Sequence, residues 1–298
     1  MTDIRYGRGL GAPIIFSVTG HRDIRAEEEA ENKIAELFHE FQKKYPCTEL
    51  ILMTGLAEGG DRIAARAAMR SGVMVAPVLP SSVENYKKTF GFGDDAAAAA
   101  DELDAILNDP EMAYSPCILS NADLTAADAS EAYRDLAKYM IANSHIIIAL
   151  WDGLEYVGKK TEGGTYDTLR TAYRGVEHTY ADTQPVPDPE GKNMSSGRLL
   201  DITEDRLIYV IKVSRRLSDD EVIKRGGTFR VPRMPQGTRG YIVPQMVADD
   251  AESFDGPSEM QEQSARIDGN DVKMHNELPL YYHRIFSKID ALNKDLKN

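Results

Sequence analysis

Short apolar runs alternate with longer segments of mixed polarity over roughly the first 215 residues of the chain. Four runs have the nearly continuous apolar character of strands buried on both faces of a sheet: Ile14–Val18, Leu50–Met53, Val73–Leu79 and Ile146–Leu150. The segments between them carry apolar residues at helical spacing, the first of them at Ile34, Leu37, Phe38 and Phe41. This alternation predicts an α/β, Rossmann-like fold, in which helices cover both faces of a mostly parallel sheet.

Helices are expected in the following segments: 26–45, 61–71, 126–143 and one that begins at Thr165. Ser81 and Glu84 have the spacing of a capping box, which predicts a short helix after the third strand. Residues 91–125 interrupt the alternation. We expect them to form an insertion at the rim of the sheet, where lids often lie.

The C-terminal third is less regular. Leu207–Val213 is predicted to be the last strand of the sheet, and the pair Arg215 and Arg216 after it to be a solvated edge. The remaining segments are expected to be a small β excursion, a polar linker and a terminal helix, at 226–245, 249–271 and 278–297 respectively. The predicted division is a Rossmann-like domain over 1–215 and a C-terminal extension over 216–298.

Composition narrows the classes of partner. The net charge of the 298-residue chain is −13, which disfavours DNA or RNA polymers as the main partner but permits a mononucleotide. Cys47 and Cys117 form no Cys-x-x-Cys pattern, and the six histidines form no metal motif. No apolar run approaches the length of a membrane helix. We therefore expect a cytoplasmic protein that binds a small molecule and needs no metal or other cofactor.

The most informative stretch is the glycine-rich segment Thr54–Arg62, which follows the second strand. Glycines let backbone N–H groups approach a ligand, and a helix start adds free donors and partial positive charge. The residues predicted to contact phosphate or ribose here are Gly55, Leu56, Ala57, Glu58, Gly59, Asp61 and Arg62. The alternative is a helix start that needs small residues for packing, with Asp61 as its cap and Arg62 paired with Asp61 or Glu58.

Two further loops follow predicted strands. The first contributes Gly20, His21 and Arg22, which are candidates for contact with a base, ribose or phosphate. The alternative is that these residues form a tight turn with surface side chains. In the second, Trp151 either stacks on a base or packs against a helix, and Asp152 is a candidate for binding ribose. Gly163, Gly164 and Thr165 form the start of the helix that follows, where a phosphate can bind. Ligands bind beyond the carboxyl ends of strands in such sheets, so three loops of this kind indicate one nucleotide pocket. Tyr86 either packs or reaches this pocket.

Taken together, these blocks resemble the SLOG superfamily, over roughly residues 10–215. The blocks are Val-Thr-Gly-His-Arg (18–22), Thr-Gly-Leu-Ala-Glu-Gly-Gly-Asp-Arg (54–62), Pro-Val-Leu-Pro (77–80) with Tyr86, Ile-Ile-Ile-Ala-Leu-Trp-Asp-Gly (146–153) and Gly-Gly-Thr (163–165). The superfamily includes the DprA DNA-processing proteins, the LOG phosphoribohydrolases and nucleotide-sensing domains of bacterial defence systems. The resemblance implies a nucleotide-derivative pocket at the strand ends.

The LOG enzymes carry Pro-Gly-Gly-x-Gly-Thr-x-x-Glu, whose glutamate serves N-glycosidic hydrolysis. This chain has no glutamate at that spacing, and Asp167 comes one residue early, which rotates it by roughly 100° on a helix. The departure favours a sensor that binds an ADP-ribose derivative or a cyclic nucleotide. The resemblance further implies that such a sensor acts as an oligomer in antiviral defence, with an effector or membrane module that is separate from this chain. The alternatives are a nucleotide N-glycosidase or phosphoribohydrolase, and a DprA-like DNA-handling protein. The candidate catalytic carboxylates of the enzyme are Glu58, Glu84, Asp152 and Asp167.

Overall fold

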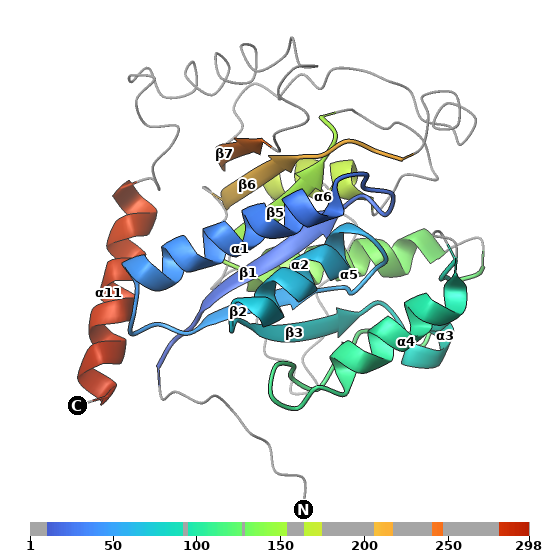
Figure 1. Cartoon of the computed structure of the whole chain (residues 1–298), viewed down its shortest axis with the longest axis horizontal. Helices are drawn as coiled ribbons and strands as arrows, with labels where there is room; N and C mark the ends of the chain where they lie inside the picture. Colours follow the sequence, from blue (N-terminus) through green and yellow to red (C-terminus); the bar gives the residue numbers. More distant parts are fainter. Residues whose placement is uncertain are drawn as a thin grey trace, which may run out of the picture.

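A seven-stranded parallel sheet forms the centre of the computed structural model, with the strand order β4-β3-β2-β1-β5-β6-β7 (Figure 1). The structure describes residues 11–91, 95–126, 129–153, 164–174, 206–216, 240–246 and 280–297. The strands are β1 (Ile14–Gly20), β2 (Leu50–Thr54), β3 (Met74–Leu79), β4 (Cys117–Ile118), β5 (Ile146–Trp151), β6 (Arg206–Lys212) and β7 (Gly240–Met246). The predicted Rossmann-like α/β fold is confirmed.

The prediction that Leu207–Val213 would end the sheet is wrong. Strand β7 continues it and pairs with β6 from Gly240 to Met246. Pro244 obscured this strand in the sequence, because proline cannot donate to a strand ladder. Proline is tolerated where a strand lies at the edge of a sheet, as β7 does among the described strands. The segment predicted to be an extension thus contributes to the central sheet.

Helices cover both faces of the sheet (Figure 1). The helices α1 (Glu27–Lys44) and α2 (Gly60–Arg70) lie on one face, and α5 (Ala129–Asn143) and α6 (Thr165–Arg174) lie on the other. Alternate residues of β5 divide between two apolar clusters. Ile146, Ile148 and Leu150 join the cluster that contains α1 and α2, whereas Ile147, Ala149 and Trp151 join the one that contains α5 and α6.

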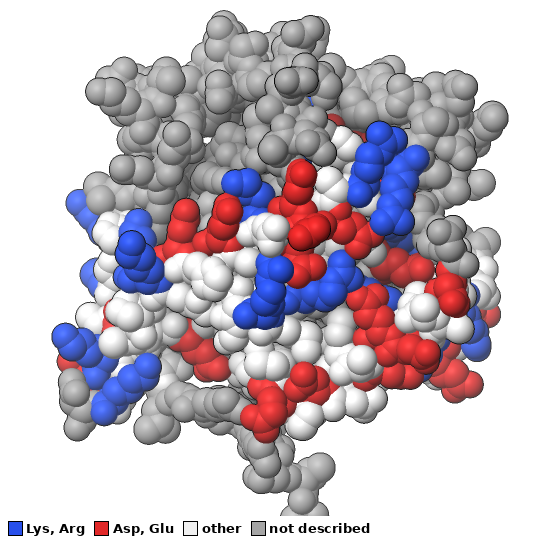
Figure 2. Space-filling model, in the orientation of Figure 1, with Lys and Arg blue, Asp and Glu red and all other residues white. Residues whose placement is uncertain are grey.

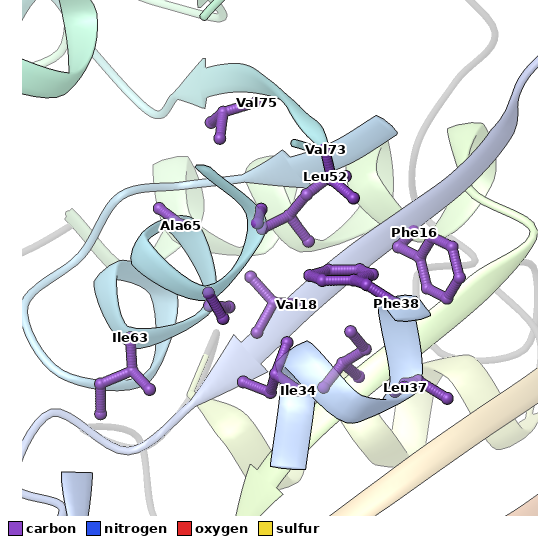
Figure 3. Packing of buried hydrophobic residues seen from close by; sticks show 14 of the residues in the cluster. Phe16, Val18, Ile34, Leu37, Phe38, Leu52, Ile63, Ala65, Val73 and Val75 are labelled. Carbon is purple, nitrogen blue, oxygen red and sulfur yellow. The ribbon is translucent and has the colours of Figure 1, made fainter. Parts of the chain in front are cut away.

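Aromatic rings fill the core between α1 and β1 (Figure 3). The Phe16 ring lies edge-on to Phe38 and Phe41, with centroids 5.3 and 5.1 Å away. Such pairs add about 0.5–1.5 kcal/mol each beyond the burial of their area. The helical apolar face predicted around Ile34 is buried as expected.

The 91–125 segment builds onto the β3 edge of the sheet. It contains helix α4 (Ala96–Leu107) and strand β4, which pairs with Val78 and Leu79. The short helix before it, α3 (Val83–Lys87), begins one residue later than the capping box predicts. The Ser82 hydroxyl accepts from the Asn85 N–H, whereas the Ser81 hydroxyl donates to a carbonyl of the insertion, that of Ala122, at 2.7 Å.

The C-terminal helix α11 (Leu280–Lys297) packs at the amino ends of the strands. The Asn293 side chain bonds both the N–H and the carbonyl of Ala12 at 2.9 Å, and Asp290 accepts from the Thr48 hydroxyl at 2.8 Å. Phe286 is fully buried in the main core. Within the described segments, no helix combines the length and apolar character needed to cross a membrane.

Candidate functional site

The strand order reverses at β1. The chain passes from β1 to β2 and β3 on one side, and β5 then lies on the other side of β1. The ends of the two strands pair at Gly20 and Leu150. Crevices that bind ligands in open parallel sheets form at this point, outside the carboxyl ends of the strands. The predicted loops after β1 and β5 lie on either side of the reversal.

Close backbone packing accounts for the glycines of the first two loops. A side chain at Gly20 would place its Cβ 2.8 Å from the Cα of Gly60, and the Gly60 N–H donates to the His21 carbonyl at 2.9 Å. Gly59 has a φ of +81°, and a Cβ there would lie 2.5 Å from the Cα of Arg22. This close packing explains Gly20 and Gly59, and it also fixes His21 and Arg22 against the start of α2. The His21 side chain is buried, so the alternative of a surface histidine is wrong.

A chain of polar contacts and ion pairs links the loops after β1, β5 and β6. His21 Nε2 lies 3.1 Å from a carboxylate oxygen of Asp152, whose other oxygen lies 3.8 Å from Arg215. Arg215 also binds Asp23 through two nitrogens, at 2.7 and 2.8 Å. The prediction of a solvated edge is wrong for Arg215, whose side chain is only 16% exposed. Sequence spacing gave no sign of Asp23 as its partner, because 192 residues separate the two.

A second cluster surrounds Arg22. Its Nη2 donates to the Tyr133 hydroxyl at a long 3.5 Å, and its guanidinium lies 5.8 Å from the centre of that ring. Burial lowers the pKa of Arg22, but Tyr86, Tyr133 and Glu58 outweigh burial, so the pKa is raised above its ordinary value. Arg22 is therefore a permanent cation in this cluster. Tyr133 was not among the predicted site residues, because it lies on α5 rather than in a loop that follows a strand.

Asp61 is a buried carboxyl group on which Arg22 exerts an electrostatic effect. It does not cap α2, since the N-cap residue is Gly59; its Oδ2 instead accepts from the Ala57 N–H at 3.4 Å. Burial raises the pKa of Asp61 to about 7, although the Ala57 N–H, Arg22, Arg62 and the Gly55 N–H lower it. Gly55 leaves room for this carboxylate, because a Cβ there would lie 3.0 Å from Oδ2.

Arg62 is buried and binds the 91–125 insertion. Its side chain is 2% exposed and forms an ion pair with Glu102 of α4 at 3.0 Å. It also donates to the carbonyls of Leu56 and Ala99, at 3.1 and 2.6 Å, and lies over the Phe90 ring. Leu56 has a φ of +53°, a conformation that non-glycine residues rarely adopt. The sequence had offered Asp61 or Glu58 as the protein partner of Arg62, and the observed ion pair is with neither.

The remaining predicted site residues differ in exposure. Glu58 is buried and accepts from the Gly91 N–H at 3.2 Å, whereas Glu84 is exposed on α3. The Trp151 ring is 3% exposed and stacks on Tyr166 of α6 at 6.1 Å, which favours the packing alternative for the tryptophan. Ala57 lies between Leu56 and Glu58 in the turn before α2.

Helix α6 begins at Thr165, as predicted, and follows β5 in the chain. Gly164 is exposed and its carbonyl accepts from the Thr168 N–H, while Thr165 and Asp167 are each 7% exposed. Gly163 lies outside the described residues. No group of three or more His, Cys, Asp or Glu side chains in the described part of the chain is arranged to hold a metal ion.

No protein-family model matches the chain, and neither does any curated protein sequence. Solved structures that resemble it include DNA processing protein A (DprA) from Streptococcus pneumoniae, at 14% identity and a TM-score of 0.35 over 74% of this chain. The chain spans 58% of the length of that protein. These likenesses are of the fold alone.

Two further structures resemble it at similar levels. The structural genomics target TM1055 is 11% identical, with a TM-score of 0.31 over 54% of this chain and 68% of its own. The molybdenum cofactor carrier protein MCP from Chlamydomonas reinhardtii is 16% identical, with a TM-score of 0.26 over 71% of this chain and 97% of its own.

Proposed function

We propose that this chain binds a nucleotide-derived small molecule at the carboxyl edge of the sheet, beside the point where the strand order reverses. The observation that carries the proposal is the convergence there of polar and ionisable side chains that follow three different strands. His21 and Arg22 follow β1, Asp61 follows β2, and Asp152 follows β5. These residues are far apart in the sequence and meet where parallel sheets bind ligands.

The types of side chain fit the parts of a nucleotide. A guanidinium such as that of Arg22 binds phosphate oxygens. Carboxylate oxygens accept hydrogen bonds from sugar hydroxyls, and Asp152 supplies such oxygens next to His21. The exposed Gly164 and the adjoining start of α6 follow the same strand end and offer backbone to a second phosphate.

We favour binding without cleavage, as a sensor or regulatory domain. The Asp152 carboxylate is paired with His21, Glu58 accepts from a backbone N–H, and Glu84 is exposed on the surface. Together with the SLOG-like sequence blocks, this supports an ADP-ribose derivative or cyclic nucleotide as the ligand, sensed by an oligomer in antiviral defence. The alternative is an N-glycosidase that acts on the same ligand.

A thermal-shift panel of AMP, ADP-ribose and cyclic mononucleotides tests the proposal, with each mixture then analysed by chromatography. A ligand at about 100 times its Kd should stabilise the protein by about 2.7 kcal/mol, a shift of a few degrees in Tm. Gly164→Arg should abolish the shift by filling the start of α6. Recovery of intact ligand supports a sensor, and release of the base shows an N-glycosidase. A panel without any shift would contradict the proposal.

A further inference from the structure

The Tyr86 hydroxyl is a buried polar group without a hydrogen-bond partner among the described residues. Tyr86 lies on α3 and is fully buried, with its ring edge-on to Phe90 at 5.2 Å. A buried hydroxyl left unpaired costs about 1–3 kcal/mol, so native proteins rarely keep one without a use. An unsatisfied donor of this kind is available to a hydrogen-bond partner that the described residues do not supply, such as a ligand.

The surroundings of this hydroxyl favour an anionic partner. Burial raises the pKa of Tyr86 well above its usual value, and among its charged neighbours Arg22 has the strongest influence, followed by Asp61. The hydroxyl therefore stays protonated and can donate. Tyr133 brings a second phenol hydroxyl to within 3.5 Å of Arg22. One guanidinium and two phenol hydroxyls provide donors for several oxygens of a single group.

The two arginines of the site differ in how fully the protein engages them. Arg62 is held by Glu102 and by the carbonyls of Leu56 and Ala99. The hydrogen bond of Arg22 in the described part of the chain is the long one to Tyr133. A guanidinium has five N–H donors, so Arg22 retains more capacity to bind a ligand than Arg62 does.

We propose that Arg22, Tyr86 and Tyr133 form an anion subsite that binds a phosphate group of the ligand. The proposal rests on the proposed function, and it assigns the phosphate to the cluster between α3, α5 and the loop after β1. Because the Tyr86 hydroxyl is buried in the free protein, the side chains around it must shift for the phosphate to reach it. The bound phosphate then accepts from both hydroxyls and from the guanidinium.

Tyr86→Phe is the sharpest test, because it removes one oxygen atom and leaves the ring in place. Without ligand, the variant should melt at the same temperature as the wild type or higher, since an unpaired buried hydroxyl is lost. Its affinity for AMP or ADP-ribose, measured by calorimetry, should fall by about 10-fold or more, the scale of a hydrogen bond to a charged group. Arg22→Ala should show a larger loss, and adenosine should bind the wild type far more weakly than AMP does.

Tyr45→Phe is the matched control. Tyr45 is equally buried, but its hydroxyl lies 3.1 Å from Nδ1 of His283 on α11, at the amino ends of the strands. This variant should lose stability and keep its affinity for nucleotide. Tyr86→Phe should thus lose affinity and keep its stability, whereas Tyr45→Phe should lose stability and keep its affinity. This contrast separates a ligand-binding hydroxyl from a structural one.

Inorganic phosphate distinguishes failure of the subsite from failure of the proposed function. If nucleotides bind the wild type and Tyr86→Phe equally well, the subsite is wrong and the nucleotide function stands. If no nucleotide binds, but phosphate binds the wild type and not Tyr86→Phe, the subsite stands and the nucleotide function falls. If neither nucleotide nor phosphate binds, both proposals are wrong.

Discussion

Single residues in this protein divide between those that hold the site in shape and those that can meet a ligand. Arg22 lies in the loop after β1 and Arg62 in the first turn of α2. Both carry the same guanidinium group, yet only Arg62 is paired with a carboxylate of the insertion. Sequence alone could not separate them, because the partner of Arg62 is Glu102, 40 residues further along the chain. The distinction has a direct consequence for stability.

Arg62→Ala should destabilise the fold by about 2–4 kcal/mol, because it removes the side-chain donor to the Leu56 and Ala99 carbonyls and leaves Glu102 with Arg66 as its remaining arginine partner. Urea denaturation measures this loss. Arg70→Ala is the control: its side chain is 49% exposed and pairs with Glu31 on the surface, so the change should stay within about 0.5 kcal/mol. Equal losses in the two variants would contradict the anchoring role of Arg62.

Asp61 predicts an unusual dependence of stability on pH. Its pKa is raised to about 7 in the folded protein, from an ordinary 3.8, so the folded state holds a proton that the unfolded state has released between these values. The free energy of unfolding should therefore fall as pH rises from about 4 to 7, by at most about 1.4 kcal/mol per pH unit from this group.

Asp61→Asn removes this titration. Urea denaturation from pH 4 to 8 measures the free energy of unfolding of the wild type and of Asp61→Asn. As pH rises, the wild type should lose stability relative to the variant. The groups that act on the carboxyl are Arg22 from the β1 loop, Arg62 from α2 and the N–H groups of Gly55 and Ala57. A difference that does not vary with pH would show that Asp61 is ionised throughout.

At the scale of elements, charged side chains join the insertion to the main layer of helices. Arg66 on α2 contacts Glu27 and Glu31 of α1 and Glu102 of α4, at 2.7–3.1 Å. Figure 2 shows acidic and basic side chains intermixed over this face of the molecule. The insertion is thus fastened to α2 as well as to β3, and the loop that carries Glu58 is held against Gly91.

Helix α11 fastens the amino ends of the strands, opposite the proposed site. Asn293→Ala should cost about 2–3 kcal/mol, because the Asn293 amide is buried and bonds the backbone of Ala12 and the Thr48 hydroxyl. Leu296→Ala on the same helix should be nearly neutral, since that side chain is 55% exposed. Both variants should bind nucleotide normally, and a loss of binding in Asn293→Ala alone would show that α11 is coupled to the site. Denaturation and calorimetry measure the two effects.

At the scale of the whole molecule, apolar periodicity was sufficient to predict the Rossmann-like sheet, since buried strands and amphipathic helices carry strong local signals. It was insufficient for β7, because Gly240 and Pro244 weaken the strand pattern in the sequence. Pairing with β6 makes this segment a strand. The loops of the proposed site were predicted from their position after strands, and their binding of a ligand stays a prediction. Their internal partners were not, because pairs such as Arg215 with Asp23 depend on the folded sheet.

The central claim is that a nucleotide-derived ligand binds where the loops after β1, β2 and β5 meet. Hydrogen exchange of the full chain, with and without saturating ADP-ribose, tests it most directly. The account predicts added protection in residues 20–22 and 55–62 and around Asp152, with residues 280–297 of α11 unchanged. No change in exchange, or protection confined to α11 and the amino ends of the strands, would contradict it.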